Sequence, residues 1–270
     1  MKKVIYQNFK NLQNIKEEML FLSKSEIRLI ILRCLKEKAA TVKEIVKITE
    51  LTYSSVSSNV KKLENKKCIQ KNNDNKFEIN YITRIYLDNI LNFSDCLKLI
   101  HKYAEFLNKH NIDKITDDEL ENINSLKNSE LIKSTPIDIY KTHNSIKSFL
   151  LNSFEIKAIF PFLHPDYPKI LECQLLKDGR LELIVPNEIY KNLILKIDSE
   201  IRKKSFDNEK LIVYTTNEPL EIYLTIGEER TSIGLFKNDN SFDQNRILTS
   251  TDKKAIEWSN NLFNNIKNQI

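Results

Sequence analysis

Residues 51–70, LTYSSVSSNVKKLENKKCIQ, decide how the first third of this chain is interpreted. The segment has the spacing of an amphipathic helix, yet it holds serines at positions 54, 55, 57 and 58. Serine costs roughly half a kcal/mol more than alanine in a helix, so helix stability does not explain their presence. The apolar residues that would face a core are spaced by three, four and three: Tyr53, Val56, Val60 and Leu63.

The opposite face of this expected helix carries short polar side chains and two lysines. Hydroxyls and amides can bind phosphates or read base edges, and lysines neutralise phosphate charge. The face is therefore typical of a helix that enters a nucleic-acid groove, although a solvated face rich in serine would have the same pattern. The outward residues are Ser54, Ser55, Ser58, Asn59, Lys61 and Lys62.

Two segments before this helix are also helical in their apolar spacing. They cover residues 23–38 and 41–49, and each begins with the Ser/Thr-x-x-Glu pattern of a capping box. In the first segment the pattern pairs Ser23 with Glu26, and in the second it begins at Thr41. The sequence therefore predicts three consecutive short helices.

A hairpin is expected after the third helix. Residues 69–71 and 76–79 are β-prone runs on either side of the turn sequence NNDN. Three helices followed by a hairpin predict a winged helix-turn-helix, in which Lys71 and Lys76 stand at the ends of the wing.

Residues 25–69 resemble the winged-helix domains of archaeal transcription regulators related to the ArsR/MarR type. The resemblance implies that the helix beginning at Tyr53 is the recognition helix and that the partner is double-stranded DNA. Many relatives have a glycine where Lys67 stands, just past that helix. The left-handed residue that ends the helix must then be Asn65 or Lys67.

The segment after the hairpin has the heptad spacing of a coiled coil. Such a seam favours a homodimer that reads two half-sites, but a helix packed against its own chain would show the same pattern. Further on, Thr116 and Glu119 have capping-box spacing, which predicts another helix start. The seam residues are Tyr86, Ile90, Phe93, Leu97, Ile100, Ala104 and Leu107.

From residue 136 onwards, helical and strand-like segments alternate. This succession, followed by hairpins, is typical of an α/β domain with a partly parallel mixed sheet. The chain is therefore predicted to be α+β or α/β, with a winged helix over 1–82, a helical connector over 83–134 and an α/β domain over 135–270. Strands are expected over 156–163, 180–186, 210–216, 220–227 and 230–236.

Two stretches, 162–168 and 231–263, resemble the C-terminal domain of the archaeal methanogenesis-regulator family. The chain departs from the family pattern at Ile233, Asn240 and Phe242. The resemblance implies a transcription regulator whose C-terminal domain is an effector or sensor module. The matching residues are Ser232, Gly234, Leu235, Phe236, Asp243, Ser250, Ala255, Trp258, Leu262 and Phe263.

The loop sequence HPDYP leaves three interpretations open. His164 and Asp166 follow a strand, where such a pair could serve acid–base chemistry in a hydrolase or transferase. They could instead brace a rigid loop through hydrogen bonds to the backbone. The third possibility is a pocket for a small-molecule effector lined by His164, Tyr167, Ser232 and Trp258. No catalytic residue is assigned, because no activated serine or cysteine motif accompanies the pair.

The net charge of +5 is unevenly distributed. Residues 1–110 carry 21 basic against 12 acidic residues, a net +9, whereas the remainder carries −4. This asymmetry indicates that only the first part contacts a polyanion.

Composition excludes several classes of protein. Three glycines cannot form the usual phosphate-binding loops, and four dispersed cysteines and four histidines show no metal-ligand spacing. We expect no cofactor and no metal, and the unpaired cysteines suit a reducing cytoplasm. No apolar run approaches the length of a membrane span, and no signal peptide is recognised.

Overall fold

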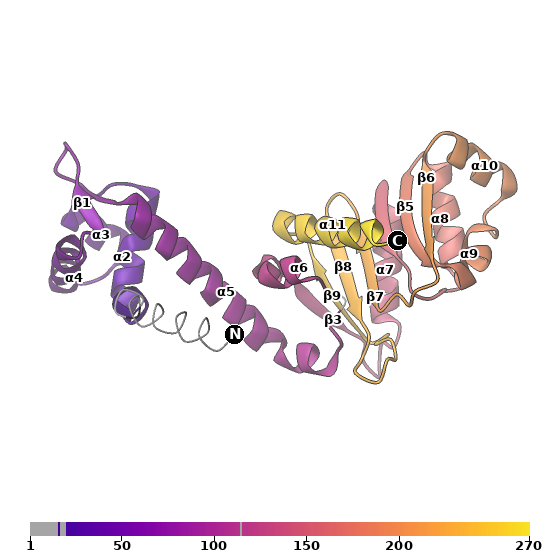
Figure 1. The fold of residues 1–270 in the computed structure, drawn as a ribbon, viewed down its shortest axis with the longest axis horizontal. Helices are drawn as coiled ribbons and strands as arrows, with labels where there is room; N and C mark the ends of the chain where they lie inside the picture. The colour runs from indigo at the N-terminus through magenta and orange to yellow at the C-terminus, as the bar shows by residue number, and fades with distance from the viewer. Residues whose placement is uncertain (1–15, 17–19, 114) are drawn as a thin grey trace, which may run out of the picture. The chain divides into compact units, whose positions relative to one another are not determined.

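The computed structural model describes residue 16 and residues 20–270, apart from residue 114. The chain divides into two compact units, Met1–Ser94 and Asp95–Ile270. In Figure 1 the first unit is coloured indigo to magenta, and the second runs on to yellow at the C-terminus. No helix in the described ranges is long and apolar enough to cross a membrane.

The first unit packs three helices and a β-hairpin around one core, as the sequence predicts (Figure 1). Six side chains of this core have no exposed surface: Ile31, Leu32, Ile45, Val56, Leu63 and Leu87. The strands of the hairpin pair antiparallel, with Gln70 opposite Glu78. The elements are α2 (Glu26–Glu37), α3 (Val42–Thr49), α4 (Tyr53–Asn65), β1 (Ile69–Lys71) and β2 (Phe77–Ile79).

Two local expectations about this unit are wrong. The cap of α2 is Ser25, whose Oγ accepts a hydrogen bond from the backbone N–H of Arg28 at 3.4 Å, and not Ser23. Tyr53 does not join the buried face of α4 but is 57% exposed, because it is the first residue of the helix and precedes the turn that packs on the core. The capping box of Thr41 is present as expected.

The end of α4 uses Lys67 as its left-handed residue, with φ of 57°. The N–H of Lys67 donates to the carbonyl of Glu64 at 2.9 Å, and the N–H of Cys68 donates to that of Leu63 at 2.9 Å. This pair of bonds is a Schellman motif, which normally favours glycine at the left-handed position. Of the two candidates, Lys67 therefore takes this role, and Asn65 stays helical.

The long helix α5 (Tyr81–Lys109) begins in the first unit and ends in the second. Asn80 holds its start, because the Asn80 side chain accepts from the N–H of Thr83 at 2.7 Å and donates to the carbonyl of Lys67. Thr83 and Leu87 are buried in the first unit. The helical geometry is interrupted at Tyr103, with φ of −114° and ψ of 17°.

The second unit is built on a seven-stranded mixed sheet of order β3-β9-β8-β7-β4-β5-β6. The neighbours β4, β5 and β6 are parallel, and the remaining pairs are antiparallel. Sequence patterning located five of these strands and missed β3 and β9. The strands are β3 (Glu130–Lys133), β4 (Glu155–Ile159), β5 (Arg180–Pro186), β6 (Leu211–Thr216), β7 (Ile222–Ile226), β8 (Thr231–Leu235) and β9 (Arg246–Ser250).

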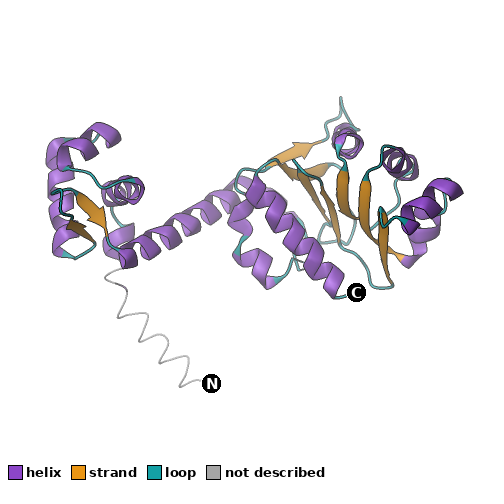
Figure 2. Ribbon diagram, turned by 90° about the horizontal axis from the view of Figure 1, so that it is seen from above, coloured by secondary structure: helices purple, strands orange, loops and turns teal. Residues whose placement is uncertain are grey.

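Helices cover both faces of this sheet (Figure 2). One core contains Trp258 and Phe263 of α11 together with Leu99 of α5, and the other contains Tyr167 and Tyr223. The helices are α6 (Asp117–Glu121), the 3-10 turn η1 (Ile123–Leu126), α7 (Lys141–Asn152), α8 (Tyr167–Leu176), α9 (Asn187–Ile194), α10 (Ser199–Asp207) and α11 (Lys253–Asn268).

The capping box expected at Thr116 and Glu119 is wrong. The Thr116 side chain makes no bond to the helix backbone, although this residue does precede α6. Glu119 is buried, and its carboxylate accepts hydrogen bonds from the Thr116 hydroxyl and from Asn265 of α11. The acidic residue therefore attaches α6 to α11.

Lys67 provides a test of this fold. Replacing it with glycine removes the steric cost of a left-handed side chain, so Lys67→Gly should raise the free energy of unfolding by about 1 kcal/mol. The matched control is Lys66→Gly, because Lys66 has φ of −86° and gains nothing from glycine. That variant should lose about 0.5–1 kcal/mol in urea unfolding followed by circular dichroism. Equal stabilities for the two variants would contradict the assignment.

Candidate nucleic-acid interface

The outer face of α4 is formed by the polar residues that the sequence singles out. The helix begins here because the Thr52 hydroxyl accepts from the N–H of Ser55 at 3.4 Å. The side-chain amide of Asn59 donates to the carbonyl of Ser55 at 2.9 Å, which fixes its orientation on the helix. Ser55 and Asn59 are partly buried, whereas the exposed members of this face are Tyr53, Ser54, Ser58, Lys61 and Lys62.

The lysines on this face keep their positive charge available. In the described part of the chain, neither Lys61 nor Lys62 has a carboxylate within ion-pair distance. Their neighbours on the helix are hydroxyls and an amide, which can approach a phosphate without repelling it. The face therefore combines positive charge with short hydrogen-bonding groups.

The two wing lysines differ in their surroundings. Lys71 lies 5.4 Å from the centre of the Phe77 ring, whereas Lys76 forms an ion pair with Glu44 of α3 at 3.3 Å. Hydrogen bonds from the backbone and side chain of Thr41, followed by that from Lys76, lower the pKa of Glu44 to about 2. Glu44 is thus ionised at neutral pH, and Lys76 is partly neutralised while Lys71 is not.

Only some residues of the heptad seam expected along α5 pack against other residues of the same chain. Ile90 packs against the core of the first unit, and Leu107 packs against the core around α11. The stripe that the second unit buries is a neighbouring one, formed by Leu99, Tyr103 and Phe106. The seam residues that remain exposed are Tyr86, Phe93, Leu97 and Ile100.

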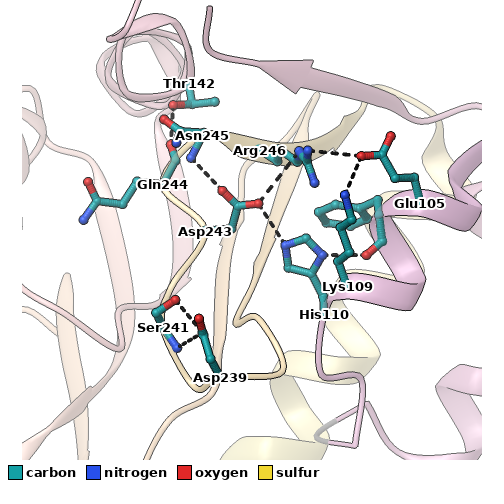
Figure 3. Close-up of polar contacts among 11 residues, drawn as sticks. Glu105, Lys109, His110, Thr142, Asp239, Ser241, Asp243, Gln244, Asn245 and Arg246 are labelled. Atoms are coloured by element: carbon teal, nitrogen blue, oxygen red, sulfur yellow. Dashed lines mark hydrogen bonds and ion pairs between the residues drawn. The ribbon is translucent and has the colours of Figure 1, made fainter.

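A buried polar contact holds the end of α5 in the second unit (Figure 3). His110 Nε2 lies 3.0 Å from Asp243 Oδ2, and both side chains are at most 5% exposed. His110 Nδ1 lies 2.5 Å from the carbonyl oxygen of Phe106. The backbone adds two bonds, from Asn111 to the carbonyl of Phe236 and from Asn238 to that of Lys109.

Both ring nitrogens of His110 face oxygen atoms. A carbonyl only accepts, so Nδ1 carries a hydrogen, and a hydrogen must also lie between Nε2 and the Asp243 carboxyl. The other Asp243 oxygen accepts from the N–H of Asn245 at 3.0 Å. Arg246 lies 3.9 Å from Asp243 and 3.3 Å from Glu105 of α5 (Figure 3). This network joins α5 to the loop between β8 and β9.

Sequence reasoning did not foresee the contact between His110 and Asp243, since 133 residues separate them. Asp243 was recognised only as part of the methanogenesis-regulator pattern. An aspartate within a family motif, in a segment without helical or strand periodicity, is the signal that could have pointed to it.

Of the four residues expected to line an effector pocket, the structure brings together His164 and Tyr167, whose ring centres are 5.3 Å apart. Tyr167 is buried, and its hydroxyl donates to that of Tyr223 at 3.2 Å. Ser232 is buried beside Thr249, with 3.2 Å between their hydroxyl oxygens. Trp258 belongs to the other core, where its indole N–H donates to the carbonyl of Glu119 at 2.8 Å. Trp258 and Tyr167 therefore belong to different cores of the domain.

His164 belongs instead to a polar cluster with α7. Its ring stacks on that of His143 at 3.7 Å, and its Nδ1 accepts from the backbone N–H of Asp166 at 3.2 Å. The Asp166 carboxylate accepts from Lys147 at 2.8 Å, and this bond, followed by the one from His143, lowers the pKa of Asp166. Burial, followed by the charge of His143, lowers the pKa of His164. These contacts hold the loop to α7, and two of them, between Asp166 and the side chains of Lys147 and His143, join it to that helix directly.

Histidine, cysteine, aspartate and glutamate side chains can bind metal ions. In the described ranges, one group of three such residues has its possible ligand atoms within 4.8 Å of one another: His143, His164 and Asp166. Their geometry does not suit a metal ion. The imidazole planes are inclined by only 20°, so their in-plane lone pairs run side by side instead of converging. The Asp166 oxygen that faces His143 also accepts a hydrogen bond from Lys147 at 2.8 Å.

Comparisons with known proteins identify the second unit. Residues 139–269 match the model of the middle domain of the methanogenesis regulatory protein FilR1. These residues are therefore similar to a FilR1 middle domain, and the resemblance to the methanogenesis-regulator family is confirmed. They cover slightly less than half of the chain.

The methanogenesis regulatory protein FilR1 of Methanothrix harundinacea (strain 6Ac) is 23% identical over 249 residues. The match covers 88% of this chain and 54% of that protein, so the chain spans about half the length of the relative. A solved structure of TrmBL2, an archaeal chromatin protein, aligns with 94% of this chain and 98% of that chain. Its sequence identity is 12% and the TM-score is 0.42.

The contact between His110 and Asp243 gives a second prediction. Asp243→Leu leaves the second ring nitrogen of a buried histidine without a partner and should destabilise the second unit by about 1–3 kcal/mol. The double variant His110→Leu, Asp243→Leu removes both polar groups and should recover much of that loss in urea unfolding. The control is Asp239→Ala, an exposed aspartate on the same loop, whose effect should be far smaller (Figure 3). Equal losses for Asp243→Leu and the control would refute the role given to this contact.

Proposed function

We propose that this chain is a DNA-binding transcription regulator that places α4 in the major groove of duplex DNA. The observation that carries this proposal is the outer face of α4, where exposed hydroxyls, an amide and lysines without carboxylate partners lie together on a helix-turn-helix scaffold. A helix presented in this way is the element with which such domains read base edges.

The distribution of charge supports the same division of roles. Residues 1–94, which form the first unit, carry 18 basic against 10 acidic residues, a net +8, and the remainder carries −3. The boundary at residue 94 is a better division than one at residue 110, because α5 residues after 94 pack into the second unit. Attraction to the DNA backbone therefore resides in the first unit.

Individual residues receive different roles in this proposal. Ser55, Ser58 and Asn59 lie on the part of α4 that contacts base edges. Phosphate contacts come from the remaining polar residues of the helix and from the wing, and Lys76 exchanges its partner Glu44 for a phosphate when DNA is bound. The phosphate-binding set is Tyr53, Ser54, Lys61, Lys62, Lys71 and Lys76.

The family of the second unit agrees with a regulatory function. The relative is a methanogenesis regulatory protein, and the matched middle domain is the part that we assign to effector control. The end of α5 is held by this domain through His110 and Asp243, so a change in the loop between β8 and β9 reaches the helix that starts beside α4.

We also propose that two copies associate through α5 and read a palindromic operator. The exposed residues of the seam form an apolar stripe that a second copy of the same helix would cover. A dimer presents two recognition helices, as needed for two half-sites one helical turn apart.

Substitutions on α4 test the proposal. A preferred duplex is first selected from a random library with the unaltered protein. Asn59→Ala should then lose about 1–3 kcal/mol of discrimination between bases. Lys62→Ala should weaken binding to all duplexes alike and reduce the salt slope by about one.

The control for these two variants is Lys203→Ala, an exposed lysine of the second unit, which should leave affinity and salt slope unchanged. Affinity is measured by fluorescence anisotropy at several salt concentrations. If Asn59→Ala and Lys62→Ala bind the selected duplex as the unaltered protein does, α4 is not the recognition helix.

The dimer is tested by placing charge on the exposed stripe. Leu97→Asp together with Ile100→Asp should convert dimers to monomers in light scattering, because two carboxylates per chain would enter an apolar interface. Both residues are 40% exposed in a single chain, so the fold of the monomer should persist. Asn92→Asp, also exposed on α5, is the control and should leave the dimer intact. A double variant that remains fully dimeric would place the interface elsewhere.

A further inference from the structure

A cavity of about 820 Å³ lies within the second unit where the end of α7, the turn between β7 and β8 and the start of α11 meet. The turn is closed by a bond from the N–H of Gly227 to the carbonyl of Arg230 at 2.9 Å. A side chain at Gly227 would come within 2.6 Å of Ser153 Oγ, so glycine permits this close approach. The lining residues are Ser148, Phe149, Asn152, Ser153, Phe154, Glu228, Glu229, Arg230, Thr251, Lys253 and Ile256.

Arg230 is held in this cavity by neutral groups. Its Nε donates to the hydroxyl of Thr249 on β9 at 2.7 Å, and its Nη2 donates to that of Ser145 on α7 at 2.9 Å. The guanidinium also lies 5.8 Å from the ring centre of Phe149. Two hydroxyls from different elements fix the orientation of the guanidinium without cancelling its charge.

The charge of Arg230 has no direct counterpart in the described part of the chain. No carboxylate there approaches the guanidinium within 4.0 Å. Glu228, at the rim, is engaged with the backbone N–H groups of Phe154 and Glu155 at 2.9 and 2.6 Å. Burial lowers the pKa of Arg230 from its ordinary value, and Glu130 counteracts this effect only in part. A half-buried cation arranged in this way favours an incoming anion.

We propose that this cavity binds a small organic carboxylate. Arg230 would receive the carboxylate through its remaining N–H groups, and the hydroxyls of Ser148 and Thr251 and the ammonium group of Lys253 would supply further polar contacts. Phe149, Phe154 and Ile256 form an apolar wall suited to a short hydrocarbon chain. A carboxylate fits better than a phosphate because one arginine and one lysine supply the positive charge while two glutamates stand at the rim.

The position of the cavity makes the carboxylate a candidate effector. Arg230 bonds to Thr249 near one end of β9, and Arg246, which contacts Glu105 of α5, is the first residue of that strand. A ligand bound to Arg230 would thus contact a residue whose partner, Thr249, lies on the same strand as Arg246, which contacts α5. This role rests on the proposed function, whereas the binding itself does not.

The test measures binding to the full chain without DNA, so that it is independent of the proposed function. Sodium hexanoate is titrated by isothermal calorimetry, with hexanamide as its neutral analogue and inorganic phosphate as the other anion. Hexanoate should bind in a saturable manner, hexanamide should not bind detectably, and phosphate should bind more weakly than hexanoate. Arg230→Gln should weaken hexanoate binding roughly tenfold or more, since it removes charge-assisted hydrogen bonds.

Two further variants keep the result interpretable. Arg230→Lys retains the charge without the fork of donors and should show intermediate affinity, which protects the test if Arg230→Gln folds poorly. Arg33→Gln, an exposed arginine of the first unit, is the matched control and should bind hexanoate as the unaltered chain does. Equal binding by Arg230→Gln and Arg33→Gln, equal binding of hexanamide and hexanoate, or tighter binding of phosphate would each overturn the proposal.

Discussion

The structure depends on one helix that belongs to two cores. The first turns of α5 bury Thr83 and Leu87 in the first unit, and its later turns bury Leu99, Tyr103 and Phe106 in the second. The break in helical geometry at Tyr103 falls within the second of these stretches. The contact of His110 with Asp243 then fixes where the helix ends.

Sequence patterning was sufficient for the parts of the fold that depend on local periodicity. The three short helices and the hairpin follow from apolar spacing and turn residues, whereas the left-handed residue at the end of α4 was left open between Asn65 and Lys67. Tyr53 was misplaced because periodicity does not show where along a helix the core begins. The strands β3 and β9 were missed because they become recognisable only once β9 is paired between β3 and β8.

The candidate sites also differ in whether their residues are neighbours in the sequence. The face of α4 could be predicted because its residues are neighbours in the sequence, and a helix converts their spacing directly into a surface. The residues of an effector pocket could not be predicted in the same way. Ser232 and Trp258 belong to the same family motif, but they lie in different layers of the domain. Arg230 has no motif around it, and its partners Ser145 and Thr249 come from distant elements. Such a site becomes visible only when the chain is folded.

The place of β9 inside the sheet limits how a signal could travel. The strand is hydrogen-bonded on both edges, to β3 and to β8, and a shift by a single residue would exchange its two faces. The strand therefore cannot shift along its neighbours to transmit a change from Thr249 to Arg246. The connection that carries Asp243 contacts His110, at the end of α5, and Asp243 itself is not part of a strand ladder. Regulation of the proposed DNA binding would then depend on which conformations of the loops are populated, while the sheet keeps its hydrogen-bonding register.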